Sequence, residues 1–303
     1  MGWIDGAGAH MNAVGVGETA LNVEFPSGPQ PDQDPVCVMP STYFVTMPIQ
    51  VRPFVQITSA DIGEDRISVT TGPNGAFGQF ILSLVGPDGT VDIANVNVPA
   101  GNGNFSFNVP NLPNKTFTSI RGVFVVNGQT GTGSGDYKIT VLGDYLNTCY
   151  NTPLETDFDG GVVNAGTSTS SCMWSSLNFR SRFLNEVNEN GSGIDSVGVA
   201  LQLEAFCQNA PPSSPPYNGK RYRRPTDIKT SCGTTPRPDV SLARGPNSSL
   251  SCGTPLYIDG IGRRVVEDRG GSVATNQLDN YRGVGVGVCS GWTNPTRKVV
   301  QLY

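Results

Sequence analysis

Two aspartates near the C-terminal end of the sequence have the surroundings that best suit chemistry. Asp268 follows a Val-Val pair by two residues and precedes a Gly-Gly pair, so we expect it where a strand ends. Asp279 lies between Leu278 and Tyr281 and is expected to point away from a buried neighbour. Carboxylates on the loops of a rigid β scaffold are a common catalytic arrangement. The alternative interpretation is that both side chains only cap turns.

Histidine chemistry is excluded by composition, because the 303-residue chain has one histidine, His10, in a Gly- and Ala-rich start. Catalysis by a Ser-His-Asp or Cys-His arrangement needs an imidazole positioned inside a folded core. Zinc hydrolase sites usually need at least one histidine as well. Any enzyme here must therefore work with carboxylates, and we expect no metal or other cofactor.

Four further residues are candidates for binding a substrate. Glu155 and Asp157 follow a Tyr-Asn-Thr-Pro segment, and they are interpreted either as site residues or as ordinary turn acids. Tyr281 lies two residues after Asp279. Trp292 is expected either to stack on a sugar ring or to cap apolar residues without any ligand.

Three short segments around the two aspartates form a combined pattern. They read Cys-Gly-Thr-Pro-Leu-Tyr-Ile at 252–258, Glu-Asp-Arg-Gly-Gly-Ser-Val at 267–273 and Leu-Asp-Asn-Tyr at 278–281, and the two aspartates are eleven residues apart. The pattern resembles the three-aspartate (3D) domain, which is the double-psi β-barrel of the lytic transglycosylase A family and of bacterial wall-remodelling relatives. The resemblance covers roughly the C-terminal half of the chain.

The resemblance implies a reaction as well as a fold. Lytic transglycosylases cleave a glycosidic bond with the substrate's own 6-hydroxyl as nucleophile, which gives a 1,6-anhydro product. One carboxyl group then serves first as acid and afterwards as base. By this resemblance Asp279 takes that role, and its apolar flank is expected to raise its pKa by desolvation. Asp268 would orient Asp279 or the substrate, and its charge would keep the proton on Asp279.

One position departs from the family pattern. The family's first aspartate should fall within residues 243–246, and Gly245 stands there instead. Two hypotheses from different classes follow. The first is a peptidoglycan lytic transglycosylase, and the alternative is a non-catalytic wall-binding or structural virion (tail-tip) protein with a degenerate barrel. An expansin-like barrel that loosens polysaccharide without cleaving it fits the same residues less well.

The composition indicates a mainly β chain, because charged residues make up 15% and turn residues are abundant, with 38 Gly and 23 Pro. Residues 1–42 show little periodicity and are interpreted as an extended N-terminal arm. Residues 43–143 contain about eight short alternating stretches, which predict an immunoglobulin-like or carbohydrate-binding-like β-sandwich. Residues 144–303 form the 3D-type barrel domain, with a helix predicted over Ser171–Glu189 from apolar spacing.

Cysteine usage indicates an oxidising environment. Six of the seven cysteines fall in the second half of the chain, and none forms a CxxC pair. They predict up to three disulfides, and the alternative is a set of buried free thiols. The first five residues lack the basic and apolar regions of a signal peptide. We therefore expect an extracellular, periplasmic or virion-associated protein.

The expected partners follow from charge and from the resemblance. The formal net charge of −5 argues against nucleic-acid binding, and no apolar run is long enough to span a membrane. The resemblance implies peptidoglycan glycan strands as the ligand. The N-terminal arm is expected to contact neighbouring subunits. A basic cluster at 220–224 is interpreted as a solvated loop, or as a contact to an acidic wall polymer or a partner.

Overall fold

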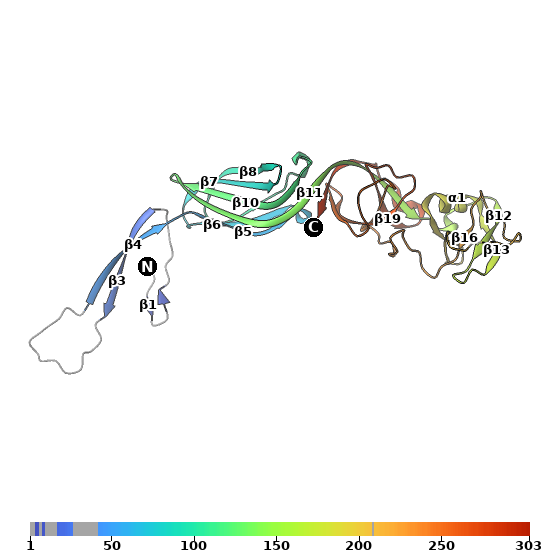
Figure 1. Cartoon of the computed structure of the whole chain (residues 1–303), viewed down its shortest axis with the longest axis horizontal. Helices are drawn as coiled ribbons and strands as arrows, with labels where there is room; N and C mark the ends of the chain where they lie inside the picture. The colour runs from blue at the N-terminus through green and yellow to red at the C-terminus, as the bar shows by residue number, and fades with distance from the viewer. Residues whose placement is uncertain (1–3, 6–7, 10–16, 27–41, 208) are drawn as a thin grey trace, which may run out of the picture. The chain divides into compact units, whose positions relative to one another are not determined.

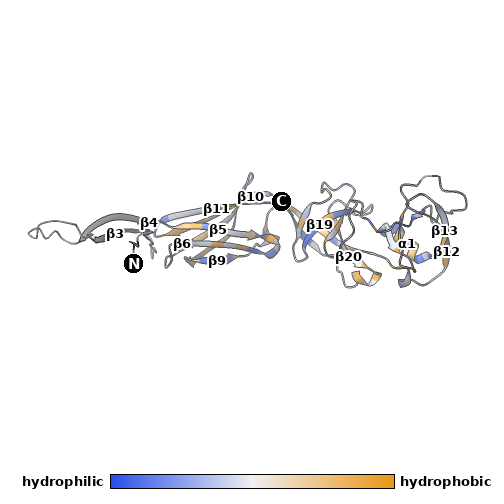
Figure 2. Ribbon diagram, turned by 90° about the horizontal axis from the view of Figure 1, so that it is seen from below, coloured by the Kyte–Doolittle hydropathy of each residue, from blue (hydrophilic) through white to orange (hydrophobic). Residues whose placement is uncertain are grey.

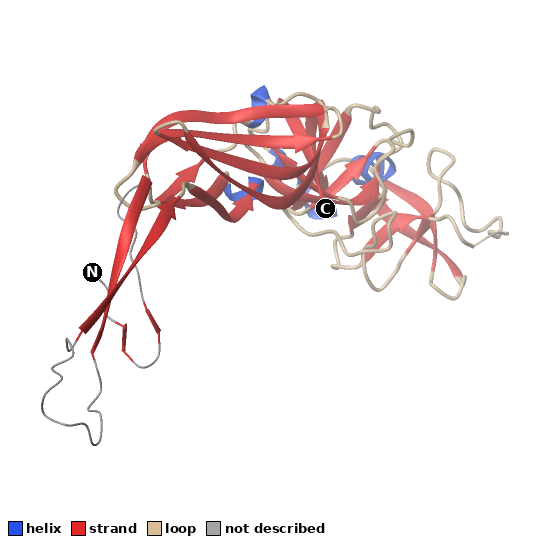
Figure 3. Cartoon of the chain, turned by 60° about the vertical axis from the view of Figure 1, so that its left-hand side comes forward, coloured by secondary structure: helices blue, strands red, loops and turns tan. Residues whose placement is uncertain are grey.

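The computed structural model describes residues 4–5, 8–9, 17–26, 42–207 and 209–303, with side chains from residue 51 onward (Figure 1). Strand predominates in these residues, as Figure 3 shows, and the described part contains one α-helix, α1 (Ser181–Asn190). The prediction of a mainly β chain with one helix is confirmed. Within the described ranges, no helix is long and apolar enough to cross a membrane.

Contacts divide the chain into two compact units. The first contains Met1–Asn108 and Lys115–Lys138, and the second contains Val109–Asn114 and Ile139–Tyr303. The long strand β11 (Gln129–Thr152) passes from the first unit into the second. The predicted domain boundaries at residues 42 and 143 stay a prediction.

The N-terminal segments form two short antiparallel pairs. Strand β1 (Ile4–Asp5) pairs with β2 (Gly8–Ala9), and β3 (Gly17–Pro26) pairs with β4 (Thr42–Val51). The rest of the predicted N-terminal arm lies outside the described residues.

The first unit contains a three-stranded antiparallel sheet of order β5-β6-β9 and part of a nine-stranded sheet, whose strands here have the order β11-β10-β7-β8. Their strands are β5 (Phe54–Asp61), β6 (Arg66–Gly72), β9 (Asn102–Phe105), β10 (Thr116–Val126), β7 (Phe77–Gly86) and β8 (Gly89–Pro99), with short 3₁₀ turns η1 (Ile62–Glu64) and η2 (Val109–Asn111) nearby in the chain. Buried residues lie along β6, β7 and β10, and Phe80, Leu82, Leu84 and Phe124 are fully enclosed. The predicted immunoglobulin-like topology stays a prediction.

The second unit is organised around a closed six-stranded barrel. The strand order is β11-β21-β18-β19-β17-β20, and β20 pairs back onto β11 to close it. The other five barrel strands are β17 (Ser241–Arg244), β18 (Pro255–Ile258), β19 (Gly262–Arg269), β20 (Gln277–Val284) and β21 (Thr296–Leu302). Leu242, Leu256, Val266, Leu278 and Val299 are buried together inside the barrel, and Figure 2 shows apolar residues along these strands. Closure leaves the barrel without an unpaired edge.

A second, smaller sheet lies in the chain between barrel strands β11 and β17, and we call residues 162–223, which contain this sheet and α1, the inserted lobe. Its order is β13-β12-β16-β15-β14, with β12 (Val162–Ser168), β13 (Trp174–Arg180), β14 (Ser192–Ile194), β15 (Ala200–Leu203) and β16 (Tyr222–Arg223). Helix α1 packs on this sheet through Phe183, Leu184 and Val187, which are buried against Leu201 and Tyr222 (Figure 1).

The helix prediction over Ser171–Glu189 is half wrong. Residues 174–180 form β13, and α1 begins only at Ser181. Strand β13 pairs with β12 along its whole length, from Ser168↔Trp174 to Val162↔Arg180. The two serines and the asparagine in this segment are weak helix formers, so cross-strand pairing decides its structure. The helix ends at Asn190, one residue beyond the predicted end, and Gly191, with a φ of 81°, caps its C-terminus.

Three disulfides tie the second unit together, as the cysteine count predicts. They join Cys149 to Cys289, Cys172 to Cys207, and Cys232 to Cys252, with Cα–Cα distances of 5.9, 5.4 and 5.8 Å. The seventh cysteine, Cys37, lies outside the described residues.

Candidate active site

The barrel brings the two aspartates to either side of one small residue. Ala243 on β17 pairs with Asp268 on β19 and with Asp279 on β20. Residues that pair directly across strands share a face of the sheet. With two steps of about 4.8 Å between strands, the two aspartate Cα atoms stand about 10 Å apart. Because Ala243 has only a methyl side chain, the space between the carboxyl groups is left open.

A β-bulge places Asp268 in this row. Leu242 pairs with Val266, but the next residue, Ala243, pairs with Asp268, so Glu267 is the extra residue of β19. Without the bulge, Glu267 would stand opposite Ala243. The Glu267 side chain is buried and is held by Ser241 and by the guanidinium of Arg237. Bulges often re-aim a side chain beside a functional site. This one turns Glu267 toward Arg237 and leaves Asp268 to face the cleft described below.

Asp279 is a carboxyl group poised to change its protonation state near neutral pH. Burial raises its pKa to about 6, a hydrogen bond from Thr148 opposes that rise, and the charge of Asp268 adds to it. Thr148 is its partner in the parallel β11–β20 ladder. The Asp279 Oδ1 atom is buried and accepts no hydrogen bond from any described residue. The group can therefore hold a proton and deliver it, as general acid catalysis requires.

Asp268 is held by three donors. Its Oδ1 atom accepts the backbone N–H groups of Ser231 and Arg269, both at 2.8 Å. Its Oδ2 atom accepts the hydroxyl of Tyr150 at 3.2 Å. Donors of this kind stabilise a charged carboxylate and fix its direction.

The two aspartates line a cleft of about 740 Å³ within the second unit. Barrel residues form one wall and residues of the inserted lobe form the other, with the segment 228–231 between them in the chain. The barrel wall includes Tyr150, Thr152, Ala243, Asp268, Asp279 and Tyr281, and the lobe wall includes Asn188, Glu189, Ser192 and Gln202. Most of these side chains are polar.

The structure brings three of the six predicted site residues together and leaves three elsewhere. Tyr281 lines the cleft with the two aspartates, and its hydroxyl lies 3.0 Å from that of Thr152. Glu155 is buried outside the cleft lining, where its carboxylate accepts the backbone N–H groups of Arg180 and Ser196 at 2.7 and 2.8 Å. That carboxylate links the residue before α1 to the loop between β14 and β15.

Asp157 and Trp292 also lie outside the cleft lining. The Asp157 carboxylate accepts the backbone N–H of Val286 at 3.0 Å. The indole N–H of Trp292 donates to the carbonyl of Asn147 at 2.8 Å, and the guanidinium of Arg282 lies 5.4 Å from the centre of the ring. These contacts hold both side chains in the framework of the barrel.

Strand β11 contributes residues at and beside the cleft that sequence reasoning did not single out, and of these Tyr150 and Thr152 line it. Thr148, Tyr150 and Thr152 alternate along the strand and contact Asp279, Asp268 and Tyr281 in turn. The spacing of these three residues could have indicated them. Polar residues at every second position just before a proline, on a partly buried strand, share one face of that strand.

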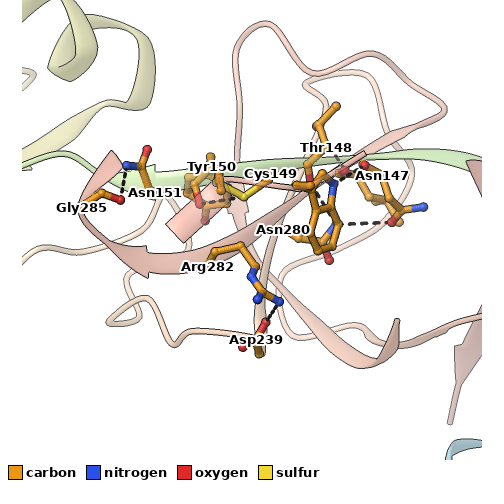
Figure 4. Close-up of a disulfide and its surroundings, with 12 residues drawn as sticks. Asn147, Thr148, Cys149, Tyr150, Asn151, Asp239, Asn280, Arg282 and Gly285 are labelled. Atoms are coloured by element: carbon orange, nitrogen blue, oxygen red, sulfur yellow. Dashed lines mark hydrogen bonds and ion pairs between the residues drawn. A yellow bond between two sulfur atoms is a disulfide. The ribbon is translucent and has the colours of Figure 1, made fainter. Parts of the chain in front are cut away.

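The Cys149–Cys289 disulfide supports this strand between Thr148 and Tyr150 (Figure 4). The side-chain amide of Asn280, next to Asp279, donates to the carbonyl of Thr148 at 3.2 Å. The amide of Asn151 donates to the carbonyl of Gly285 at 2.7 Å. The backbone on both sides of the site is therefore fixed by covalent and hydrogen-bonded contacts.

Gly245 has no room for a side chain. A Cβ atom there would lie 2.4 Å from the carbonyl oxygen of Val273 and 2.7 Å from that of Ala274. Both are backbone atoms of the loop after β19, which passes directly over Gly245. The loop fills the space that an aspartate side chain would need. The packing of this loop therefore accounts for glycine at position 245.

Gly245→Ala is therefore expected to destabilise the second unit. The added methyl forces the 270–274 loop to move, and overpacking of this kind costs about 1–3 kcal/mol. Thermal unfolding followed by circular dichroism measures the loss. The matched control is Gly271→Ala, because nothing lies within 4 Å of a Cβ atom at that position. Equal melting temperatures for the two variants would contradict the tight packing at Gly245.

The described residues show no group of three or more His, Cys, Asp or Glu side chains that could hold a metal ion.

Comparisons with known proteins give matches in structure alone. No protein-family model matches the sequence, and no curated protein matches it. One similar structure is Escherichia coli MltA with bound chitohexaose, at a TM-score of 0.39 and 14% identity, covering 55% of this chain and 75% of that chain. Another is the membrane-bound lytic murein transglycosylase from Agrobacterium tumefaciens, at a TM-score of 0.37 and 10% identity, covering 55% and 76%. At such scores and identities these structures do not locate a site in this chain.

Proposed function

We propose that this chain is a peptidoglycan lytic transglycosylase, which cleaves glycosidic bonds of the bacterial cell wall without water and releases 1,6-anhydro products. The observation that carries the proposal is the placement of Asp279, whose pKa is raised to about 6, in an open cleft across Ala243 from a second carboxylate. The resemblance of residues 252–281 to the 3D domain supports the same reaction.

The reaction needs only the groups that the cleft supplies. Protonated Asp279 donates its proton to the oxygen of the scissile bond, and the C1–O bond breaks toward an oxocarbenium-like state. The carboxylate of Asp268 stabilises the developing positive charge. The 6-hydroxyl of the same sugar then bonds to C1, and the Asp279 carboxylate takes the proton of that hydroxyl. The acid is regenerated, and no water is consumed.

The proposal extends to fold and location. The closed barrel with its parallel β11–β20 and β17–β19 pairs is assigned as a double-psi barrel, and the first unit as an immunoglobulin-like or carbohydrate-binding-like module. Three disulfides fit an oxidising compartment, periplasmic or extracellular. Glycan strands are the proposed ligand, and neighbouring subunits are proposed to contact the N-terminal arm.

The first test is the release of soluble muropeptides from purified peptidoglycan by the full chain, followed by mass spectrometry. Products that end in a 1,6-anhydro sugar support the proposal. If the chain sediments with the wall and releases nothing, the proposal fails, and the non-catalytic wall-binding or structural virion protein takes its place. Peptidoglycan cleaved to reducing ends would instead indicate a hydrolase.

The rate of cleavage is expected to fall as pH rises through about 6. The first step needs protonated Asp279, and the pKa of that group is raised to about 6, so the acid form is lost above this pH. Initial rates of product release between pH 4.5 and 8.5, at constant ionic strength, measure this decrease in rate. A rate that rises through the same interval would mean that the essential form of Asp279 is the carboxylate.

A further inference from the structure

Tyr150 makes a contact that crosses the barrel. It lies on β11, whereas Asp268 lies on β19, and strands β20 and β17 stand between them in the sheet. The Tyr150 hydroxyl nevertheless donates to Asp268 Oδ2 at 3.2 Å. The side chain therefore lies along the barrel wall of the cleft, across the strands that carry Asp279 and Ala243. A surface tyrosine that only covers apolar residues would not need this contact.

The surroundings of Tyr150 fix it in this position. It pairs with Tyr281 in the β11–β20 ladder, and the two rings lie 5.2 Å apart between centroids. The Tyr281 hydroxyl in turn meets the Thr152 hydroxyl at 3.0 Å. The adjacent Cys149 is bound to Cys289, so the backbone at Tyr150 is anchored covalently. A side chain held by ring packing, strand pairing and a neighbouring disulfide is well suited to hold another group in place.

We propose that Tyr150 is a positioning residue, which holds the Asp268 carboxylate toward the cleft in the orientation that the proposed reaction needs. The inference rests on the proposed function. The backbone N–H groups of Ser231 and Arg269 hold only Oδ1 of Asp268. Among the described residues, Tyr150 donates the hydrogen bond that holds Oδ2, and it therefore fixes the orientation of the carboxylate plane.

The protonation state of Tyr150 supports this role. Burial, and after it the charge of Asp268, raises the pKa of the Tyr150 hydroxyl far above its ordinary value. The hydroxyl therefore keeps its proton throughout the working pH range and acts as a permanent donor. It cannot itself serve as a general base.

Tyr150→Phe tests the proposal through two measurements. On soluble glycan strands we expect kcat to fall about 10- to 100-fold with KM little changed, because misplacing a group acts on the transition state. The second measurement is the titration of the Asp279 carboxyl carbon by NMR. Burial raises the pKa of Asp279 and the charge of Asp268 adds to that rise, so an Asp268 carboxylate that is free to turn away should lower the pKa of Asp279.

The matched control is Tyr217→Phe in the inserted lobe. It also removes a tyrosine hydroxyl with a side-chain partner, since Tyr217 bonds to Asn185 at 3.0 Å, but it lies outside the cleft lining. We expect this variant to keep the native kcat and the native titration of Asp279. A loss of kcat in Tyr217→Phe equal to that in Tyr150→Phe would reduce the effect to general destabilisation and overturn the proposal.

A double-mutant cycle shows whether Tyr150 acts through Asp268. In an Asp268→Asn background, adding Tyr150→Phe should lower kcat by no more than about twofold further, because its partner is already changed. Full additivity of the two losses would overturn the proposal, as would native kcat and native Asp279 titration in Tyr150→Phe alone. If the native chain releases no product, the proposed function fails, while the Asp279 titration still decides whether Tyr150 positions Asp268.

Discussion

Asp279→Asn is expected to lower the release of 1,6-anhydro products by about a thousandfold, because a single general acid contributes about 10²- to 10⁴-fold and here serves in both steps. Asparagine keeps the size and the possible hydrogen bond to Thr148, but it cannot donate a proton with the required acidity. Reducing-end and anhydro-sugar analysis of digested peptidoglycan measures the loss. Retained activity would show that Asp279 is not the acid.

The same variant should be more stable than the native chain above pH 6. The unfolded aspartate has a pKa near 3.8, and folding raises it to about 6, so the native fold loses stability as pH rises from about 4 through 6. A neutral asparagine removes that cost. We therefore expect the melting temperature of Asp279→Asn at pH 8 to exceed the native value, and at pH 4 to match it.

The control for both measurements is Asp259→Asn. Asp259 follows β18 in the same barrel and lies outside the cleft lining. Its backbone N–H, which the substitution keeps, bonds to Lys298. We expect native activity and a native dependence of the melting temperature on pH. An activity loss in Asp259→Asn equal to that in Asp279→Asn would mean that any change of charge in the barrel has this effect.

Removing the Cys149–Cys289 disulfide should cost the second unit the most stability. The bond joins residues 140 positions apart, and a loop of this size contributes about 4–5 kcal/mol in the chain-entropy account. Cys149→Ser combined with Cys289→Ser is therefore expected to unfold at a markedly lower denaturant concentration. Urea unfolding of the full chain measures the change. Product release should fall too, because Thr148 and Tyr150 lie on either side of Cys149.

The comparison variant combines Cys172→Ser with Cys207→Ser in the inserted lobe. That disulfide closes a shorter segment, 35 positions, so we expect a loss about 1 kcal/mol smaller. Neither cysteine lines the cleft. If Cys172→Ser with Cys207→Ser costs more stability and more activity than Cys149→Ser with Cys289→Ser, the Cys149–Cys289 disulfide does not stabilise the barrel as we expect.

The sequence singled out the two aspartates but could not predict how the fold places them. Asp268 and Asp279 could be chosen because each sits beside residues that a strand buries, and the absence of a core histidine left few rivals. The row Asp268–Ala243–Asp279 could not be predicted, because it depends on the bulge at Glu267. A bulge shifts every later side chain to the other face, and no local residue pattern marks this one.

Features that the sequence could not reveal have a common physical origin in tertiary contacts. Residues 174–180 have apolar spacing that suits a helix, yet pairing with β12 makes them a strand. Glu155 looks like a site acid in the sequence, but its two oxygens are consumed by backbone N–H groups of distant segments. Gly245 reads as a lost aspartate, and only the loop above it explains why no side chain fits.

The most direct test of the account is digestion of peptidoglycan by the native chain in water enriched in ¹⁸O. If the 6-hydroxyl of the sugar is the nucleophile, the products carry the anhydro bridge and no ¹⁸O, and Asp279→Asn gives none of them. Products with ¹⁸O at the new reducing end would show that water attacks. That result would contradict the non-hydrolytic reaction that we assign to this cleft.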